Sequence, residues 1–186
     1  MKTLAAVALS SLFIAPVAQA ITIDFESPPT ASTDTSVTTQ GFTFTATGPY
    51  ESTWLPNSGI WNNPTENLSY CGDCVLTIEA ENQSLFDLNS FDFTNSGSTD
   101  PAMTVTGYKA GQLVATTAIV VASQQFNTFS FDSAWQGLDR VEFDAMPAIA
   151  SFVDNVDVSV VPVPAAVWLF ASALAGLGWM RRKPLV

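Results

Sequence analysis

The sequence predicts an all-β fold, an antiparallel β-sandwich of jelly-roll-like arrangement, with a signal peptide before it and a transmembrane helix after it. Short runs of alternating apolar and polar residues recur along residues 21–160, and many of their members are β-branched or aromatic. Gly, Pro, Asn, Asp and Ser separate these runs. No stretch of this region has the spacing of an amphipathic helix. These patterns are typical of a sandwich of short strands.

Nine segments are predicted to be strands. They are 21–25, 42–47, 75–80, 86–94, 103–108, 113–121, 126–131, 140–145 and 152–160. The apolar positions in 86–94 and 126–131 change phase by one residue, which indicates a β-bulge or a switch between sheets. We expect hairpin turns at Asn95-Ser96-Gly97 and Lys109-Ala110-Gly111. The polar segment 28–41 is expected to be a surface loop.

The first 20 residues have the pattern of a secretory signal peptide. Lys2 precedes an apolar run, which ends at the small-x-small sequence Ala18-Gln19-Ala20. Cleavage after Ala20 would leave Ile21 as the first residue of the exported protein. A permanent N-terminal anchor is the alternative.

The C-terminal segment is predicted to cross a membrane. Residues 165–180 carry no charge, and Arg181, Arg182 and Lys183 follow them directly. As a helix this run would extend about 24 Å, slightly less than the ~30 Å hydrocarbon core. The three cations are expected to stay in the cytoplasm, because basic residues are retained on that side. A helix buried in a globular core is the alternative.

The same segment resembles a known sorting signal. Pro162-Val163-Pro164, the apolar run and the basic triplet follow one another as in the PEP-CTERM signal, and VPVPAAVWLF resembles its VPLPA variant. This resemblance implies an exosortase substrate: an integral-membrane transpeptidase would process the chain at the inner membrane and send the body to the cell surface or extracellular matrix of a Gram-negative bacterium. Val163 stands where the name-giving motif has Glu, which leaves the exosortase subtype open.

Residues 21–160 are expected to form one strongly acidic domain. They contain all 17 acidic residues against two basic ones, Lys109 and Arg140, which gives a net charge of −15. Such a surface repels nucleic acid, which we therefore exclude as a partner. The sequence has no His, which excludes Ser-His-Asp and Cys-His catalysis, and we expect no enzymatic activity.

Asp154 is predicted to be a buried carboxylate. It shares its parity in the last strand with Val156, Val158 and Val160, which places it on the apolar face, where it needs a partner. The FE of the first strand and Asp154-Asn155 of the last resemble the calcium-containing jelly rolls of carbohydrate-binding modules. That resemblance implies a structural Ca²⁺ held by Glu26 and Asp154, with Asp24 as a further candidate. Hydrogen bonds from backbone amides to Asp154 are the alternative.

Aromatic residues of the segment 48–70 are candidate glycan-binding residues. Tyr50, Trp54, Trp61 and Tyr70 lie there among Asn and Glu. A sugar ring presents an apolar C–H face and a rim of hydroxyls, so its sites combine aromatic platforms with polar partners. Covering one end of the core is the alternative role of these aromatic residues.

Cys71 and Cys74 are the only cysteines of the sequence. In an exported protein they are predicted to form a disulfide, because a zinc site would need two further ligands.

Together these features predict an exported, non-enzymatic protein with a structural or adhesive role in an exopolysaccharide matrix. The first alternative is a carbohydrate-binding module that uses Tyr50, Trp54 and Trp61. A glycan-active enzyme is the other alternative, and no acid/base pair stands out for it.

Overall fold

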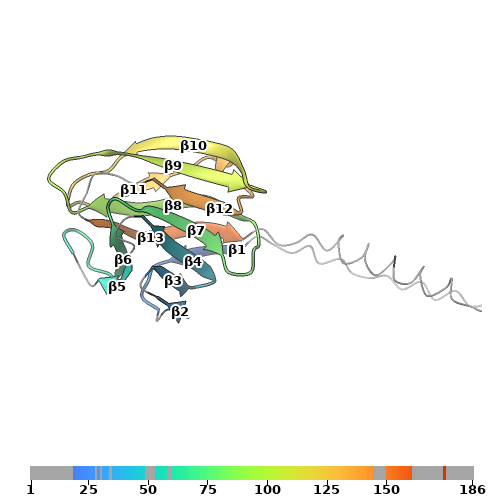
Figure 1. Cartoon of the computed structure of the whole chain (residues 1–186), viewed down its shortest axis with the longest axis horizontal. Coiled ribbons are helices and arrows are strands. Elements are labelled where there is room, and N and C mark those ends of the chain that lie inside the picture. Colours follow the sequence, from blue (N-terminus) through green and yellow to red (C-terminus); the bar gives the residue numbers. More distant parts are fainter. Residues whose placement is uncertain are drawn as a thin grey trace, which may run out of the picture. The chain divides into compact units, whose positions relative to one another are not determined.

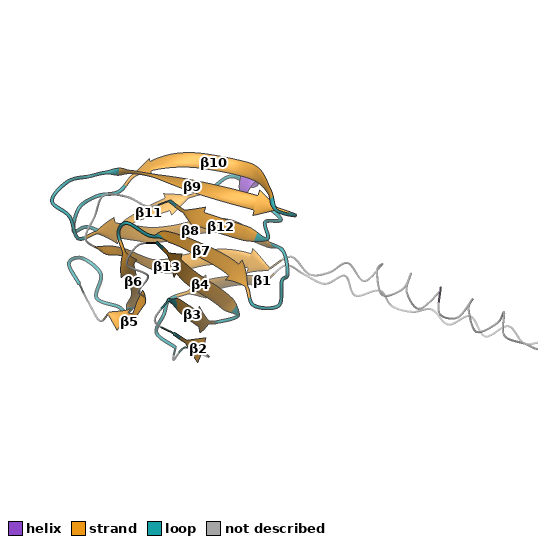
Figure 2. Cartoon of the chain, viewed as in Figure 1, coloured by secondary structure: helices purple, strands orange, loops and turns teal. Residues whose placement is uncertain are grey.

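Two antiparallel sheets form the body of the protein, as the alternating runs predict (Figures 1 and 2). The computed structural model describes residues 19–27, 29, 31–33, 35–48, 53–57, 60–144, 150–160 and Leu174, without the side chains of 31–32 and 53–57. All of these except Leu174 belong to one unit, Ala18–Val161. Within the described part no helix is long and apolar enough to cross a membrane. Ala18, the motif 162–164 and the triplet 181–183 lie outside it, so the sorting predictions stay predictions.

Sheet A has the strand order β11-β8-β13-β6-β5, and β1 also pairs with β13. Its strands are β1 (Gln19–Ile23), β5 (Thr53–Asn57), β6 (Asn67–Cys71), β8 (Phe86–Asn95), β11 (Asn127–Ser130) and β13 (Ala150–Val160). β1 starts at Gln19, so cleavage after Ala20 would remove its first two residues.

Sheet B has the order β10-β9-β12-β7-β4-β3-β2. Its strands are β2 (Ala31–Ser32), β3 (Ser36–Thr39), β4 (Phe42–Thr47), β7 (Val75–Ala80), β9 (Ala102–Lys109), β10 (Gln112–Val120) and β12 (Arg140–Phe143). A short 3-10 helix, η1 (Ser133–Trp135), precedes β12. The all-β prediction is confirmed, and the jelly-roll detail stays a prediction.

The core lies between the two sheets and is rich in aromatic rings. Phe91 of sheet A meets Phe143 of sheet B at 4.7 Å between ring centroids, and Phe86 of sheet A meets Phe42 of sheet B at 5.2 Å. All four side chains are buried. Burial of one such ring contributes roughly 1.5–3 kcal/mol, so these contacts are a main source of the attraction between the sheets.

Two local predictions about connections are wrong. Segment 28–41 contains β2 and β3, whose alternation is hard to detect because Val37 is the one apolar residue of β3. Asn95-Ser96-Gly97 is no hairpin: Asn95 Oδ1 accepts a hydrogen bond from Gly97 N at 2.7 Å, and the chain crosses from β8 in sheet A to β9 in sheet B.

The hairpin at Lys109-Ala110-Gly111 is confirmed, since it joins β9 to β10. Ala110 and Gly111 both have positive φ, 51° and 72°, as the tight turn of a β-hairpin requires. Glycine adopts this conformation without a steric cost, which explains its place at the end of the turn.

The predicted phase change in 86–94 is confirmed as a bulge. Ser90 pairs with Asp157 and Leu88 with Val158, so Asn89 is the extra residue and both Leu88 and Phe91 reach the core. β11 has no register shift, because Phe126 precedes the strand. The phase change predicted there as a bulge or sheet switch is therefore only a strand boundary.

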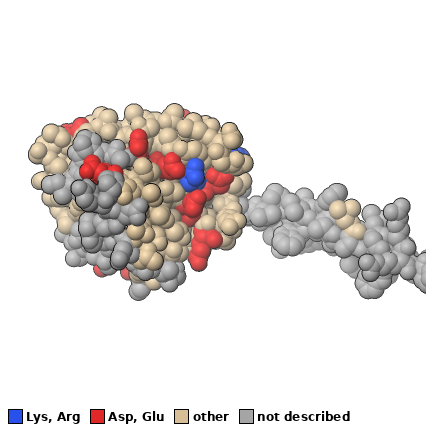
Figure 3. All heavy atoms as spheres, in the orientation of Figure 1, with Lys and Arg blue, Asp and Glu red and all other residues tan. Residues whose placement is uncertain are grey.

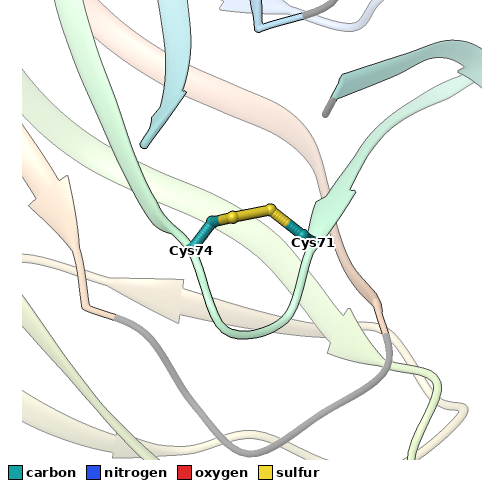
Figure 4. The surroundings of a disulfide bond; sticks show 2 residues. All are labelled: Cys71 and Cys74. Carbon is teal, nitrogen blue, oxygen red and sulfur yellow. A yellow bond between two sulfur atoms is a disulfide. The ribbon is translucent and has the colours of Figure 1, made fainter. Parts of the chain in front are cut away.

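Cys71 and Cys74 form the predicted disulfide (Figure 4). The bond closes the turn between β6 of sheet A and β7 of sheet B, where Cys74 N donates to Cys71 O at 3.1 Å. A Cβ atom on Gly48 would lie 2.9 Å from Cys74 Sγ, so only glycine fits beside this turn. The disulfide thus fixes one point at which the chain passes between the sheets.

Candidate functional site

Asp154 is completely buried, as predicted, but on the other face of its sheet. Val153 belongs to the core, so the next residue of the alternating strand points to the outer face of sheet A. A bulge follows, in which Asn155 has a φ of 47°, and it turns Val156 back into the core. The predicted burial is confirmed, and the predicted face is wrong, because the bulge interrupts the parity on which that prediction depended.

The segment 60–66 covers Asp154 on this outer face. Asn63 Nδ2 donates to Asp154 Oδ2 at 2.7 Å, and Thr65 Oγ1 donates to the same oxygen at 3.0 Å. Asn155 N donates to Asp154 Oδ1 at 2.7 Å. Three neutral donors therefore hold the carboxylate. The predicted alternative, bonds from backbone amides, accounts for one of the three, and side chains of a distant segment supply the other two.

Burial raises the pKa of Asp154 to about 6, against the opposing effect of its bonds to Asn63, Asn155 and Thr65. The nearby Asp92 carboxylate adds to the increase. Asp92 belongs to the same network, because its Oδ2 accepts from Asn155 Nδ2 at 2.9 Å. Asp154 has no exposed surface, so it has no access to a substrate and is unsuited to act as a general acid.

We expect Asp154 to make the stability of the protein pH-dependent. Its pKa is about 6 in the folded state and about 3.9 in an unfolded chain, so the folded state binds the proton more tightly. The contribution of this group to the free energy of unfolding is therefore greatest below about pH 4 and decreases as the pH rises through 6. Urea denaturation from pH 4 to 8 with EDTA present should show this decrease in the wild type relative to Asp154→Asn. A constant difference between the two proteins would disprove the assignment.

Trp61 is presented to solvent by the same segment. Ile60 and Asn63 form a β-bridge closed by a bond from Asn63 N to Ile60 O at 2.9 Å, and Trp61 has a left-handed φ of 50°. The residue is 44% exposed, and its ring meets Phe152 of sheet A edge-on at 5.1 Å.

Asn62 holds the segment from its other side. Its Oδ1 accepts from Phe126 N at 2.7 Å, and its Nδ2 donates to Phe126 O at 3.1 Å. The turn that carries Trp61 is thus bound to the sheet through Asn62 and Asn63 on its two sides. Trp61 is therefore fixed in place, although it lies at the surface.

The structure separates the other predicted aromatic residues. Tyr70 is buried in the core, so it is excluded as a platform for a sugar. Tyr50 lies outside the described residues. Trp54 of β5 pairs with Ser69 of β6, and Ser69 pairs with Phe152 of β13. The backbone of Trp54 therefore lies in the same cross-strand row of sheet A as Phe152, the residue whose ring contacts Trp61.

Two of the predicted calcium ligands, Asp154 and Glu26, are hydrogen-bonded to adjacent residues of one short segment. Thr65 bonds to Asp154, and the backbone N of the next residue, Glu66, donates to Glu26 Oε1 at 2.7 Å. Asp24 Oδ1 accepts from Glu26 N at 3.2 Å. Across the described ranges no group of three or more acidic, Cys or His residues could hold a metal ion. The calcium site stays a prediction.

Sequence reasoning did not find Asn62, Asn63, Thr65 or Asp92. The bond between Asn63 and Asp154 joins residues 91 positions apart, and no spacing rule indicates such a pair. A signal did exist for the bulge, because Phe152 and Val153 are adjacent apolar residues in an otherwise alternating strand and Asn, which follows at 155, is enriched among residues with positive φ.

No family model and no curated protein matches the sequence. Among solved structures, a mutant family 29 carbohydrate-binding module complexed with mannohexaose is 15% identical and covers 77% of this chain and 93% of its own, with a TM-score of 0.43. A family 29 module from Piromyces equi is 13% identical and covers 77% and 91%, with a TM-score of 0.43. An exo-β-agarase is 12% identical and covers 76% of this chain but 25% of its own, with a TM-score of 0.46. Similarities with TM-scores this low support no conclusion about function.

Proposed function

We propose that this protein is a non-enzymatic carbohydrate-binding β-sandwich whose site is built around Trp61 on the outer face of sheet A. The exposed indole, held by Asn62 and Asn63 and supported by Phe152, is the observation that carries the proposal. An indole face stacks on the C–H face of a sugar. Asn62 beside it is exposed, and its Nδ2 carries a second N–H, besides the one donated to Phe126 O, for a sugar hydroxyl.

The charge of the domain favours a neutral glycan. Its net charge is −15, and acidic side chains outnumber basic ones on the face seen in Figure 3. A strongly negative surface repels uronic acids and sulfated sugars. We therefore expect the ligand to be a neutral polysaccharide.

A glycan array probed with the full chain tests this function. Signals should appear on neutral glycans. If the site extends from Trp61 along the cross-strand row Phe152, Ser69 and Trp54, Trp54→Ala should reduce these signals. An array without any signal would overturn the glycan proposal and leave the structural or adhesive role that the sequence predicts.

We propose from the C-terminal sequence alone that an exosortase sorts the chain after export. The motif 162–164, the apolar run and the cations 181–183 support this inference. Fractionation of cells that produce a tagged chain tests it, and a cytosolic location would rule it out.

We further propose a structural calcium ion near Glu26 and Asp154. Adjacent residues of one segment, Thr65 and Glu66, bond to Asp154 and Glu26, and carboxylate oxygens are ligands of the kind that Ca²⁺ prefers. EDTA is expected to lower the Tm of the wild type and to leave the Tm of Asp154→Ala unchanged. Equal melting of the wild type with and without EDTA would count against a calcium site.

A further inference from the structure

A second segment, 121–126, borders the site of Trp61. It joins β10 to β11 and lies against the end of β8, where Thr94 Oγ1 accepts a hydrogen bond from Gln125 N at 2.9 Å. Thr94 in turn pairs with Phe152 of β13, the residue whose ring contacts Trp61. The segments 60–66 and 121–126 are therefore held by two paired residues of sheet A.

Asn62 joins the two segments directly. It follows Trp61 in the chain, and its side chain bonds to both backbone groups of Phe126, at 2.7 Å to N and 3.1 Å to O. Phe126 and Phe152 are both buried, yet neither belongs to the core between the sheets. The neighbour of Trp61 is thus bonded to the neighbour of Gln125, which places the two exposed residues on one rigid unit.

Gln125 is exposed although its backbone is fixed on both sides. Its own N bonds to Thr94, the preceding Gln124 N donates to Asn95 O at 2.9 Å, and the following residue is held by Asn62. Across the described residues, the side-chain amide of Gln125 makes no hydrogen bond. A polar group on a fixed backbone loses little conformational entropy when it binds a ligand.

We propose that Gln125 selects the sugar that stacks on Trp61, by bonding two adjacent hydroxyls of the ring through its side-chain amide. This inference rests on the proposed carbohydrate-binding function and adds the residue that gives it specificity. The amide has one acceptor oxygen and two N–H donors, and each sugar hydroxyl can both donate and accept. An indole stacks on any apolar C–H face, whereas a bonded pair of hydroxyls must have one orientation.

Calorimetric titration of the full chain with two neutral probes tests the assignment. The probes are tetramers of β-1,4-linked glucose and of β-1,4-linked mannose, which differ only in the orientation of one hydroxyl in each unit. The wild type should discriminate between them about tenfold in Kd. Gln125→Ala should weaken the preferred tetramer about tenfold and reduce the ratio of the two Kd values to below about threefold. Trp61→Ala should weaken both tetramers and leave their ratio unchanged.

Two further variants separate recognition from damage to the fold. Gln136→Ala removes another exposed glutamine, two residues before Leu138, which bridges to Phe86 at the opposite end of β8. Both Kd values should stay the same in that variant. Gln125→Glu keeps the size of the side chain but lacks the N–H donors, so it should lower the ratio as Gln125→Ala does.

The outcomes distinguish this inference from the proposed function. A ratio of Kd values that is the same in the wild type and Gln125→Ala, or no binding of either tetramer, would overturn the role of Gln125. Signals on other neutral glycans that disappear in Trp61→Ala would show that the carbohydrate-binding function survives that result. A glycan array without any signal would overturn both.

Discussion

Trp61→Ala is expected to weaken binding of the preferred glycan about 30-fold in Kd, which corresponds to roughly 2 kcal/mol. The indole is the exposed platform of the site, and alanine removes its stacking surface while Asn62 and Asn63 still hold the turn. Trp61→Phe should recover part of the affinity, because a smaller ring still stacks. Calorimetric titration with the glycan measures both values.

Two controls separate this effect from damage to the fold. Urea denaturation of Trp61→Ala should show a loss of only about 1 kcal/mol, since the ring is partly exposed and loses mainly its contact with Phe152. Leu113→Ala removes an exposed apolar side chain from sheet B and should leave the Kd unchanged. An unchanged Kd in Trp61→Ala would place the binding site elsewhere.

Asp154→Ala is expected to lower the free energy of unfolding by about 3 kcal/mol at pH 7. The carboxylate accepts bonds from Asn63, Thr65 and Asn155 in a buried position, and alanine leaves these donors without their acceptor. The segment that carries Trp61 loses the same anchor, so glycan affinity should fall together with stability. Chemical denaturation and titration of one preparation measure the two effects.

Asp157→Ala is the matched control, because it removes the same kind of side chain from the same strand. Asp157 is partly exposed, and its Oδ1 accepts only a long bond of 3.5 Å from Asn89. We expect a loss below about 1 kcal/mol there. If Asp154→Ala were no more destabilising than Asp157→Ala, the network around Asp154 would not be the anchor of the segment 60–66.

Several structural features followed from short stretches of sequence. The β4 and β7 segments were predicted with their observed bounds, because Phe-Thr-Phe-Thr and Leu-Thr-Ile-Glu alternate without interruption. The disulfide followed from two cysteines three positions apart. β3 was missed because one apolar residue in four gives too weak an alternation. The face of Asp154 was missed because a bulge shifts the parity on which such predictions depend.

The sequence by itself determined the sheet-rich fold, the acidic surface and the disulfide, because each depends on composition or on neighbours along the chain. Only the tertiary structure decided that Asn63 and Thr65 cover Asp154, that Trp61 is exposed while Tyr70 is buried, and that Asn62 bonds to Phe126. These features depend on which distant segments meet. That choice follows from how the two sheets bury their apolar faces together, and no local pattern records it.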